Sequence, residues 1–267
     1  MIEINKNLNS KLNDINLDNF YVIADFDKTI TSKQSNTTFS LFSKSGFYPE
    51  EYLKERNANY NHYRPLELDV NITEEEKSKI VKEWQEASYN LMLKYKVKES
   101  DILKILENDD ALTLRDGAIN FINYLNENNI PLIISSAGIG NFIIELLKKH
   151  ECYTNNIYVY SNMLKFKDDE IVDSIDDIIH SMNKNAIKVS DEFLEKTKDK
   201  KYAIVIGDQL SDINMAKYLP KKDIISFGFL EANVEESKKM FYDSFDVVLT
   251  ENESFDAIKK LLIERRK

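Results

Sequence analysis

The chain has a single cysteine, four prolines and six glycines among its 267 residues. The lone Cys152 excludes an internal disulfide and fits a reducing compartment. The N-terminal region lacks the apolar core of a signal peptide. The one membrane-like stretch, residues 130–147, contains Pro131, two serines and two glycines, so a strand, turn and helix are favoured over a membrane span. We therefore expect a cytoplasmic protein without a membrane partner.

Positive charge is also in deficit, with 36 lysines and arginines against 46 aspartates and glutamates and a formal net charge of −10. Because no basic stripe offsets this excess, we expect no nucleic-acid partner. Small anions stay compatible, since a metal ion and local lysines can reverse the field inside one cleft. Hydrophobic residues at 42% and aromatic residues at 11% predict a folded globular protein, which we expect to be a monomer.

Short apolar strands alternate with helical segments along most of the chain. This alternation predicts an α/β fold, with a mostly parallel, Rossmann-like sheet covered by helices on both faces. Right-handed crossovers then bring the carboxyl ends of the strands to one edge. The predicted strands are residues 21–24, 131–135, 157–160, 202–206, 224–227 and 247–249, and the predicted helices are residues 118–128, 141–150, 212–218 and 254–264.

One region breaks this alternation. Residues 46–114 contain no convincing strand but show helical periodicity, and Thr73 with Glu76 resembles a capping box. We interpret this region as a helical cap domain inserted after the first predicted strand, with residues 1–45 and 115–267 forming the core domain. The predicted cap helices are residues 49–61, 74–95 and 99–107.

Two aspartates, Asp25 and Asp27, directly follow the first predicted strand. At the end of an extended strand both carboxylates can face one spot, at the sheet edge where open α/β sheets bind ligands. Such a pair repels unless a cation lies between its members, and Mg²⁺ prefers oxygen ligands. One carboxylate could instead attack phosphorus. A structural role as a helix cap is the alternative; an EF-hand is excluded because Asn36 stands where its final glutamate belongs.

Two later loops carry matching groups. Ser136, Ala137 and Gly138 follow a predicted strand, where a hydroxyl and backbone N–H groups can bind phosphate oxygens, although such residues also fill ordinary turns. Asp208 follows another strand and is available to a metal, and Asp212 either caps the next helix or acts directly. Half of the glycines of the chain fall in these two loops, where backbone must approach a ligand closely.

These motifs resemble those of the haloacid dehalogenase superfamily of phosphatases, with Asp25 to Thr29 as the first motif, Ser136 as the second and Gly207 to Asp212 as the last. More narrowly, the chain resembles the cytosolic type III pyrimidine 5'-nucleotidases over nearly its whole length. Further counterparts in the same order are residues 136–140, Ser161-Asn162, Ile179-His180, Asn183-Lys184 and residues 242–246.

The resemblance implies an Mg²⁺-dependent nucleotidase acting through an aspartyl-phosphate. Asp25 would be the nucleophile, and Asp27 would protonate the leaving oxygen and then activate water. Asp25, Asp208 and the backbone carbonyl of Asp27 would hold Mg²⁺. Ser136 and Ala137 would bind the phosphate.

Lys184 would neutralise that phosphate, because its Asn-Lys context fits the family better than those of Lys165 and Lys167. In the cap, Glu67 would recognise the polar edge of a base. Ser88 aligns with another substrate contact, although it could equally be a surface hydroxyl of a helix.

The segment between Asp27 and the cap is shorter than in the vertebrate enzymes, so the preferred base, pyrimidine or 7-methylguanine, stays open. Tyr89 could stack on a base or pack in the core. The alternatives are a phosphatase of the same superfamily acting on phosphoserine or a sugar phosphate, and a catalytically idle binding protein on this fold.

Overall fold

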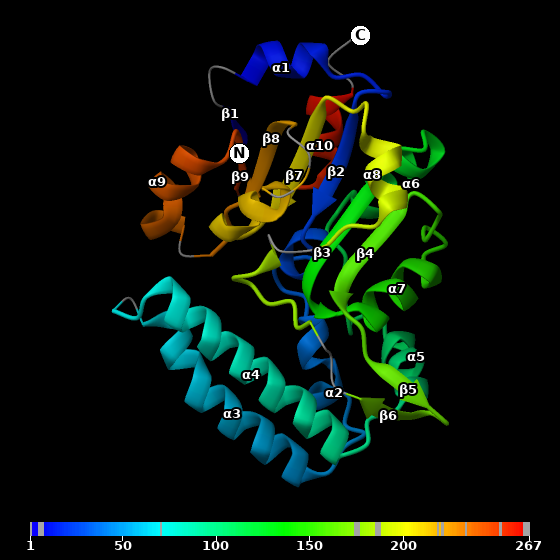
Figure 1. The fold of residues 1–267 in the computed structure, drawn as a ribbon, viewed down its shortest axis with the longest axis vertical. Helices are drawn as coiled ribbons and strands as arrows, with labels where there is room; N and C mark the ends of the chain where they lie inside the picture. The colour runs from blue at the N-terminus through cyan, green and yellow to red at the C-terminus, as the bar shows by residue number, and fades with distance from the viewer. Residues whose placement is uncertain are drawn as a thin grey trace.

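A seven-stranded sheet forms the centre of the protein in the computed structural model (Figure 1). Six neighbouring strands run parallel, and β1 joins the edge antiparallel to β9. The strand order is β1 (Ile2–Ile4), β9 (Val247–Leu249), β8 (Asp223–Phe229), β7 (Tyr202–Gly207), β2 (Phe20–Ala24), β3 (Leu132–Ile139) and β4 (Ile157–Asn162). The structure describes residues 2–4, 8–69, 71–173, 177–184, 188–217, 219, 222–232, 234–250 and 253–263.

The strand β2 lies inside the sheet and is buried on both faces, as its unbroken apolar sequence predicts. Its side chains alternate between two apolar layers. Val22 packs in the layer formed with α6 (Ala118–Glu127), α7 (Gly140–Lys149) and α10 (Phe255–Leu262). Ile23 faces the other layer, to which α8 (Asp191–Thr197) contributes Phe193. The predicted α/β architecture with helices on both faces is confirmed.

Three of the helices described between β2 and β3 fall within residues 46–114. The first two, α3 (Glu50–Leu68) and α4 (Glu74–Lys94), pack as an antiparallel hairpin beyond the carboxyl ends of the strands (Figure 1). The helix α5 (Glu99–Glu107) follows. The predicted capping box at the start of α4 is present, because Thr73 N donates to Glu76 Oε2 at 3.1 Å and Glu76 N donates to Thr73 Oγ1 at 3.3 Å.

Several predicted boundaries were wrong. The helix α3 continues seven residues beyond the expected end at Asn61, because Pro65 lies in its last turn and costs it only one backbone hydrogen bond. The helix predicted at residues 212–218 is a 3₁₀-helix, η4 (Leu210–Ala216), and the predicted ends Tyr218 and Glu264 lie outside the described residues. In the part of the chain that the structure describes, no helix is long and apolar enough to cross a membrane.

Several short elements were not predicted, including β1, which precedes the strand that the sequence indicated as the first. These elements are β1, α1 (Leu8–Asp14), η1 (Phe26–Ile30), η2 (Thr38–Ser40), α2 (Leu41–Lys44), the hairpin of β5 (Lys165–Lys167) and β6 (Glu170–Asp173), α8, and α9 (Val234–Ser244).

Candidate active site

The tight loop η1 carries the chain away from the end of β2. Asp25 continues the β2 ladder, since its N–H donates to Ile206 O at 3.0 Å, and Lys28 then turns the chain with a φ of 70°. The buried side chain of Arg115 holds this turn by donating to Lys28 O at 2.5 Å and to Thr29 O at 2.8 Å. The loop thus positions Asp25 at the carboxyl edge of the sheet.

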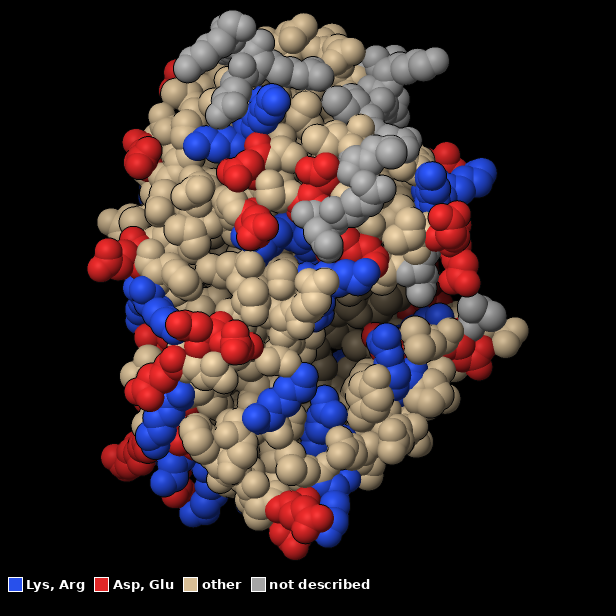
Figure 2. Space-filling model, turned by 180° about the vertical axis from the view of Figure 1, so that it is seen from behind, with Lys and Arg blue, Asp and Glu red and all other residues tan. Residues whose placement is uncertain are grey.

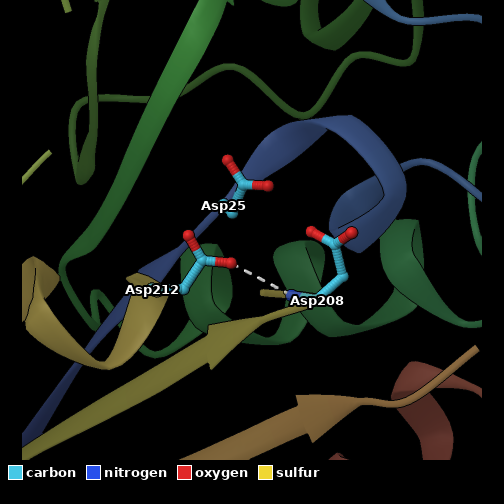
Figure 3. A group of neighbouring side chains, drawn as sticks. All are labelled: Asp25, Asp208 and Asp212. Atoms are coloured by element: carbon cyan, nitrogen blue, oxygen red, sulfur yellow. Dashed lines mark hydrogen bonds between the residues drawn. The ribbon is translucent and has the colours of Figure 1, made fainter. Parts of the chain in front are cut away.

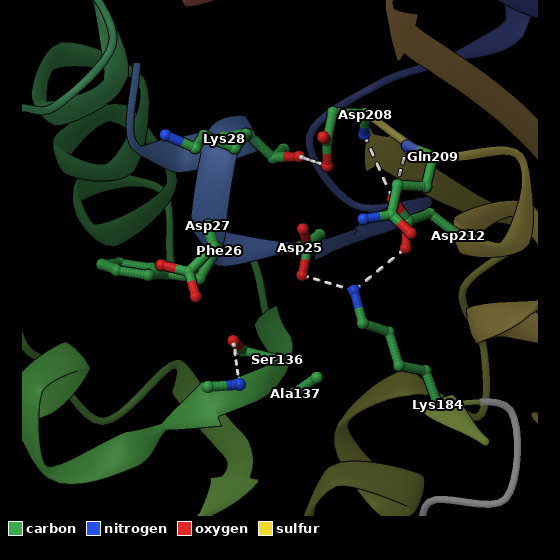
Figure 4. A network of polar contacts seen from close by, with 12 residues as sticks. Asp25, Phe26, Asp27, Lys28, Ser136, Ala137, Lys184, Asp208, Gln209 and Asp212 are labelled. Atoms are coloured by element: carbon green, nitrogen blue, oxygen red, sulfur yellow. Dashed lines mark hydrogen bonds and ion pairs between the residues drawn. The ribbon is translucent and has the colours of Figure 1, made fainter. Parts of the chain in front are cut away.

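Asp25 is buried, with 3% of its surface exposed. Burial raises the pKa of its carboxyl from 3.8 to about 7, against the opposing effect of the Lys184 ammonium. Lys184 Nζ lies 2.5 Å from Asp25 Oδ1 and 3.0 Å from Asp212 Oδ1 (Figure 4). Burial alone would lower the pKa of Lys184, but these two carboxylates raise it, so the lysine is a charged donor.

Three carboxylates converge beside Lys184, one directly after β2, one directly after β7 and one from η4. Asp25, Asp208 and Asp212 each offer an oxygen within 4.8 Å of the others (Figure 3). Burial and the neighbouring Asp25 raise the pKa of Asp208 well above its usual range. Such a set of hard oxygen donors fits a divalent cation of the Mg²⁺ type, which would offset the repulsion among them.

Asp212 makes the contacts of a residue that caps a helix and also contacts Lys184. Its Oδ2 accepts the backbone N–H groups of Asp208 at 3.1 Å and Gln209 at 3.0 Å, as a helix cap does, while its Oδ1 accepts from Lys184. Only glycine fits at position 207, because a Cβ there would lie 2.4 Å from Asp212 Cβ. The last motif, Gly207 to Asp212, therefore packs closely and fixes the positions of two carboxylates of the acidic cluster.

Asp27 has different partners from Asp25. Its Oδ1 accepts Thr38 N at 3.0 Å, and its Oδ2 accepts the Thr38 hydroxyl at 3.0 Å. Burial raises the pKa of Asp27, while the two Thr38 donors oppose this rise. Gly138 permits this contact, because a Cβ there would lie 1.9 Å from Thr38 Oγ1. The two aspartates of the first motif thus have different hydrogen-bond partners, Lys184 for Asp25 and Thr38 for Asp27.

The last part of β3 brings a hydroxyl to the same site, because the strand continues to Ile139, beyond the predicted end at residue 135. Ser136 is buried, and its Oγ accepts Gly138 N at 3.0 Å (Figure 4). This accepted bond leaves the hydroxyl hydrogen of Ser136 available to a ligand oxygen. The rival lysines Lys165 and Lys167 are exposed on β5 and do not line the cavity described next.

A cavity of about 300 Å³ joins this site to the α3–α4 hairpin. Figure 2 shows a hollow between the two parts of the molecule, with lysine and arginine side chains beside it. The net charge of −10 therefore does not describe the mouth of the cavity. The core residues that line it include Asp25, Asp27, Ser136, Ala137 and Lys184, and the hairpin residues include Arg56, Tyr60, Glu67, Trp84, Gln85 and Ser88.

Comparison with known proteins identifies the family. The family model described as pyrimidine 5'-nucleotidase (UMPH-1) matches residues 22–265. The chain belongs to this 5'-nucleotidase family. The human 7-methylguanosine phosphate-specific 5'-nucleotidase is 32% identical over 253 residues, which are 92% of this chain and 84% of that protein. The Drosophila melanogaster protein of the same name is 30% identical, over 90% of this chain and 78% of its own length.

Solved structures agree with this membership. A crystal structure of cytosolic 5'-nucleotidase IIIB bound to cytidine has a TM-score of 0.88 and 28% identity, and the match covers 98% of this chain and 92% of that one. A substrate-bound phosphoserine phosphatase has a TM-score of 0.53 and 15% identity, over 90% of this chain and 97% of its own, which shows the shared fold alone. The resemblance drawn from the motifs is confirmed.

The hairpin of this 5'-nucleotidase family member brings both predicted cap residues to the cavity. Glu67 lines the cavity and forms an ion pair with Arg64. Ser88 also lines it, and its hydroxyl donates to Trp84 O at 2.9 Å. Tyr89, by contrast, is 1% exposed and packs edge-on against an aromatic ring, so the core interpretation holds for it.

Some contacts of this 5'-nucleotidase site have no signal in sequence spacing. Thr38, which holds Asp27, begins η2, a 3₁₀-helix too short to show periodicity in the sequence. Gln85 lies on α4 and donates to Ala137 O at 3.2 Å. A single glutamine in a helix gives no sign in the sequence of such a contact. Only the family resemblance indicates Asn162 in the sequence.

Proposed function

We infer that this chain hydrolyses nucleoside 5'-monophosphates to a nucleoside and phosphate through an aspartyl-phosphate, with Mg²⁺ as cofactor. The observation that carries this proposal is one cavity that holds two kinds of group. Its core end has the buried Asp25 beside Lys184 and Ser136, which fit a phosphoryl group. Its hairpin end has the rings of Tyr60 and Trp84, which pack edge to face with centroids 5.8 Å apart and offer an aromatic surface to a base.

In the proposed reaction, a carboxylate oxygen of Asp25 attacks phosphorus while the bond between phosphorus and the nucleoside 5'-oxygen breaks. Asp27 gives its proton to that oxygen, so a neutral nucleoside leaves. The same carboxylate then takes a proton from water, which attacks the phosphorus of the aspartyl-phosphate and regenerates Asp25. The raised pKa of Asp27 supports the acid role, because the carboxyl must be protonated when the substrate binds.

We assign the metal to Asp25, Asp208 and the backbone carbonyl of Asp27, with Asp212 beside them. Bound Mg²⁺ would supply positive charge to the phosphoryl oxygens. Lys184 adds a second positive charge, and Ser136 and the backbone at Ala137 bind the phosphate by hydrogen bonds. We propose residues 46–114 as the cap domain over this site, residues 1–45 and 115–267 as the core domain, and a cytoplasmic monomer.

The raised pKa of Asp25 predicts a pH-dependent response to Mg²⁺. Between pH 3.8 and about 7 the folded, metal-free protein keeps a proton that the unfolded chain has lost. The contribution of Asp25 to the free energy of unfolding therefore falls as the pH rises through this window and no longer changes above it. Mg²⁺ must displace that proton, so we expect Mg²⁺ to raise the melting temperature more at about pH 8 than at about pH 5.5.

Thermal unfolding with and without Mg²⁺ measures this effect. In a matched experiment Asp208→Asn should lose most of the Mg²⁺-induced rise at both pH values. An equal rise at both pH values in the wild-type protein would contradict the assignment of Asp25 to the metal.

The base preference follows from Glu67. We propose that Glu67 accepts hydrogen bonds from the polar edge of the base, with Ser88 nearby. Losing a hydrogen bond to a charged group costs roughly 1.5–3 kcal/mol, so Glu67→Ala should raise KM about 10- to 100-fold for the preferred base. Glu86→Ala is the control, because Glu86 also pairs with a neighbouring residue on its helix but is exposed and does not line the cavity.

The assay measures phosphate release from the 5'-monophosphates of uridine, cytidine and 7-methylguanosine, with phosphoserine and a sugar phosphate alongside. Selective loss on one base class supports a nucleotidase. Equal turnover of all five substrates, unaffected by Glu67→Ala, would indicate the broader superfamily phosphatase. If no substrate releases phosphate in the presence of Mg²⁺, the result would support the alternative of a catalytically idle binding protein on this fold.

A further inference from the structure

Two sequence motifs, Ser161-Asn162 and residues 179–184, contribute only Lys184 to the proposed reaction. In the structure the two segments are joined by hydrogen bonds between Asn162 and Ile179. Asn162 ends the edge strand β4 and is 1% exposed. A buried amide of this kind is costly unless its donors and acceptor are all used, so its partners indicate what it holds in place.

Asn162 connects two segments that are distant in sequence. Its Nδ2 donates to Ala137 O at 2.8 Å and to Ile179 O at 2.7 Å. Its Oδ1 accepts Ile179 N at 2.8 Å. The neighbouring Ser161 adds a fourth bond, because its hydroxyl donates to Gly138 O at 2.9 Å. Both donors and the acceptor of the Asn162 amide are therefore used, and two consecutive carbonyls near the carboxyl end of β3 are fixed.

These bonds set the direction of the Ser136 hydroxyl. The peptide between Ala137 and Gly138 is planar, so holding its carbonyl at Asn162 also fixes where its N–H points. That N–H donates to Ser136 Oγ at 3.0 Å. Because the Oγ accepts this bond, its own hydrogen is left for an oxygen in the cavity. Gln85 also donates to Ala137 O, at 3.2 Å.

The other two bonds of Asn162 set the start of the segment that ends at Lys184. After Ile179 the chain forms a turn in which His180 N donates to Asn183 Oδ1 at 2.7 Å and Asn183 Nδ2 donates to Ile178 O at 2.8 Å. Lys184 follows directly and reaches Asp25. The position of its ammonium therefore depends on where Asn162 anchors the turn.

We propose that Asn162 is a positioning residue that fixes the separation between the Ser136 hydroxyl and the Lys184 ammonium, so that both contact the same phosphoryl group. This inference rests on the proposed phosphate site. The hydrogen bonds of Asn162 reach none of the metal carboxylates directly, and they meet the hairpin only at Ala137 O, which Gln85 shares. The loss should therefore fall on phosphate binding rather than on Mg²⁺ binding.

The test uses Asn162→Ala, and Asn162→Asp, which keeps the acceptor for Ile179 N but has no amide donor. The control is Asn156→Ala, because Asn156 lies just before β4, at the opposite end of the strand. It is also buried, at 3% exposure, and its Nδ2 donates to Ile130 O at 2.9 Å. The binding of inorganic phosphate in the presence of Mg²⁺ and of Mg²⁺ alone is measured by calorimetry, with the melting temperature of each variant.

We expect both Asn162 variants to bind phosphate about 10-fold or more weakly, in line with the loss of a well-placed hydrogen-bond donor pair, with unchanged Mg²⁺ affinity. Asn156→Ala should lower the melting temperature by a similar amount and keep wild-type phosphate affinity. Ser161→Ala, which removes only the bond to Gly138 O, should weaken phosphate binding about 2- to 5-fold.

Wild-type phosphate affinity in a folded Asn162 variant would overturn the inference. The same loss of phosphate affinity in Asn156→Ala would also overturn it, because the loss would then result from lower stability and not from the displaced Ser136 and Lys184. If neither Asn162 variant folds, Ser161→Ala decides, and unchanged phosphate affinity in that variant counts against the proposal. A wild-type protein that binds no phosphate would instead overturn the proposed function.

Discussion

Asp25→Asn is expected to abolish turnover of nucleoside monophosphates and to prevent any covalent intermediate from forming. An amide oxygen is a far weaker nucleophile than a carboxylate, so we expect a loss of roughly 10⁴-fold or more in kcat. Asp27→Asn should also stop turnover of nucleotides, by roughly 10²- to 10⁴-fold, because the leaving oxygen can no longer be protonated. The intact Asp25 of that variant should still be phosphorylated when the leaving group needs no proton.

Rapid quenching after mixing with p-nitrophenyl phosphate separates the two variants. Asp27→Asn should release a burst of p-nitrophenol and accumulate the phospho-enzyme, whereas Asp25→Asn should do neither. Asp109→Asn is the control, since Asp109 lies in an exposed ion pair with Lys149. A phospho-enzyme on Asp25→Asn would contradict the assignment of the nucleophile.

Lys184→Met is expected to reduce both stability and activity. Its ammonium lies between the buried carboxylates of Asp25 and Asp212, and breaking such a buried pair costs roughly 3–5 kcal/mol because the remaining charges are uncompensated. Removing a preorganised charge from the phosphoryl site should also lower kcat/KM by roughly 10²- to 10³-fold. Thermal unfolding and steady-state kinetics measure the two effects.

Mg²⁺ provides a check on the cause of this loss. A cation bound among the carboxylates should recover part of the melting temperature of Lys184→Met but little of its activity, because the phosphate contact is still missing. Lys149→Met is the control for a partly exposed ion pair and should change stability by about 1 kcal/mol or less. Near wild-type kcat/KM in Lys184→Met would show that another cation neutralises the phosphate.

The sequence predicted those parts of the site whose signal is local. The apolar run of β2 followed by Asp25 and Asp27 places both acids at the sheet edge, and Asp208 follows β7 in the same way. Parallel topology then brings these strand ends together without further information.

Contacts between distant loops could not be predicted in this way. Thr38 holds Asp27 and Asn162 holds Ala137 through side-chain geometry that no spacing rule encodes. The pairing of β1 with β9 was missed because three residues at the end of a chain carry too little periodicity to indicate a strand.

The order of the strands in the sheet has a consequence for folding of the newly made chain. The strand β2 is synthesised early, but one of its neighbours, β7, begins at Tyr202, and β1 joins the sheet only when Ile2 pairs with Leu249 of β9. The other neighbour of β2, β3, begins at Leu132 and is made first, but at translation rates of about 5–20 residues per second β7 follows only roughly ten seconds or more after β2. During this time one edge of β2 has no strand beside it, so aggregation in the cell competes with folding before Asp25 acquires its surroundings.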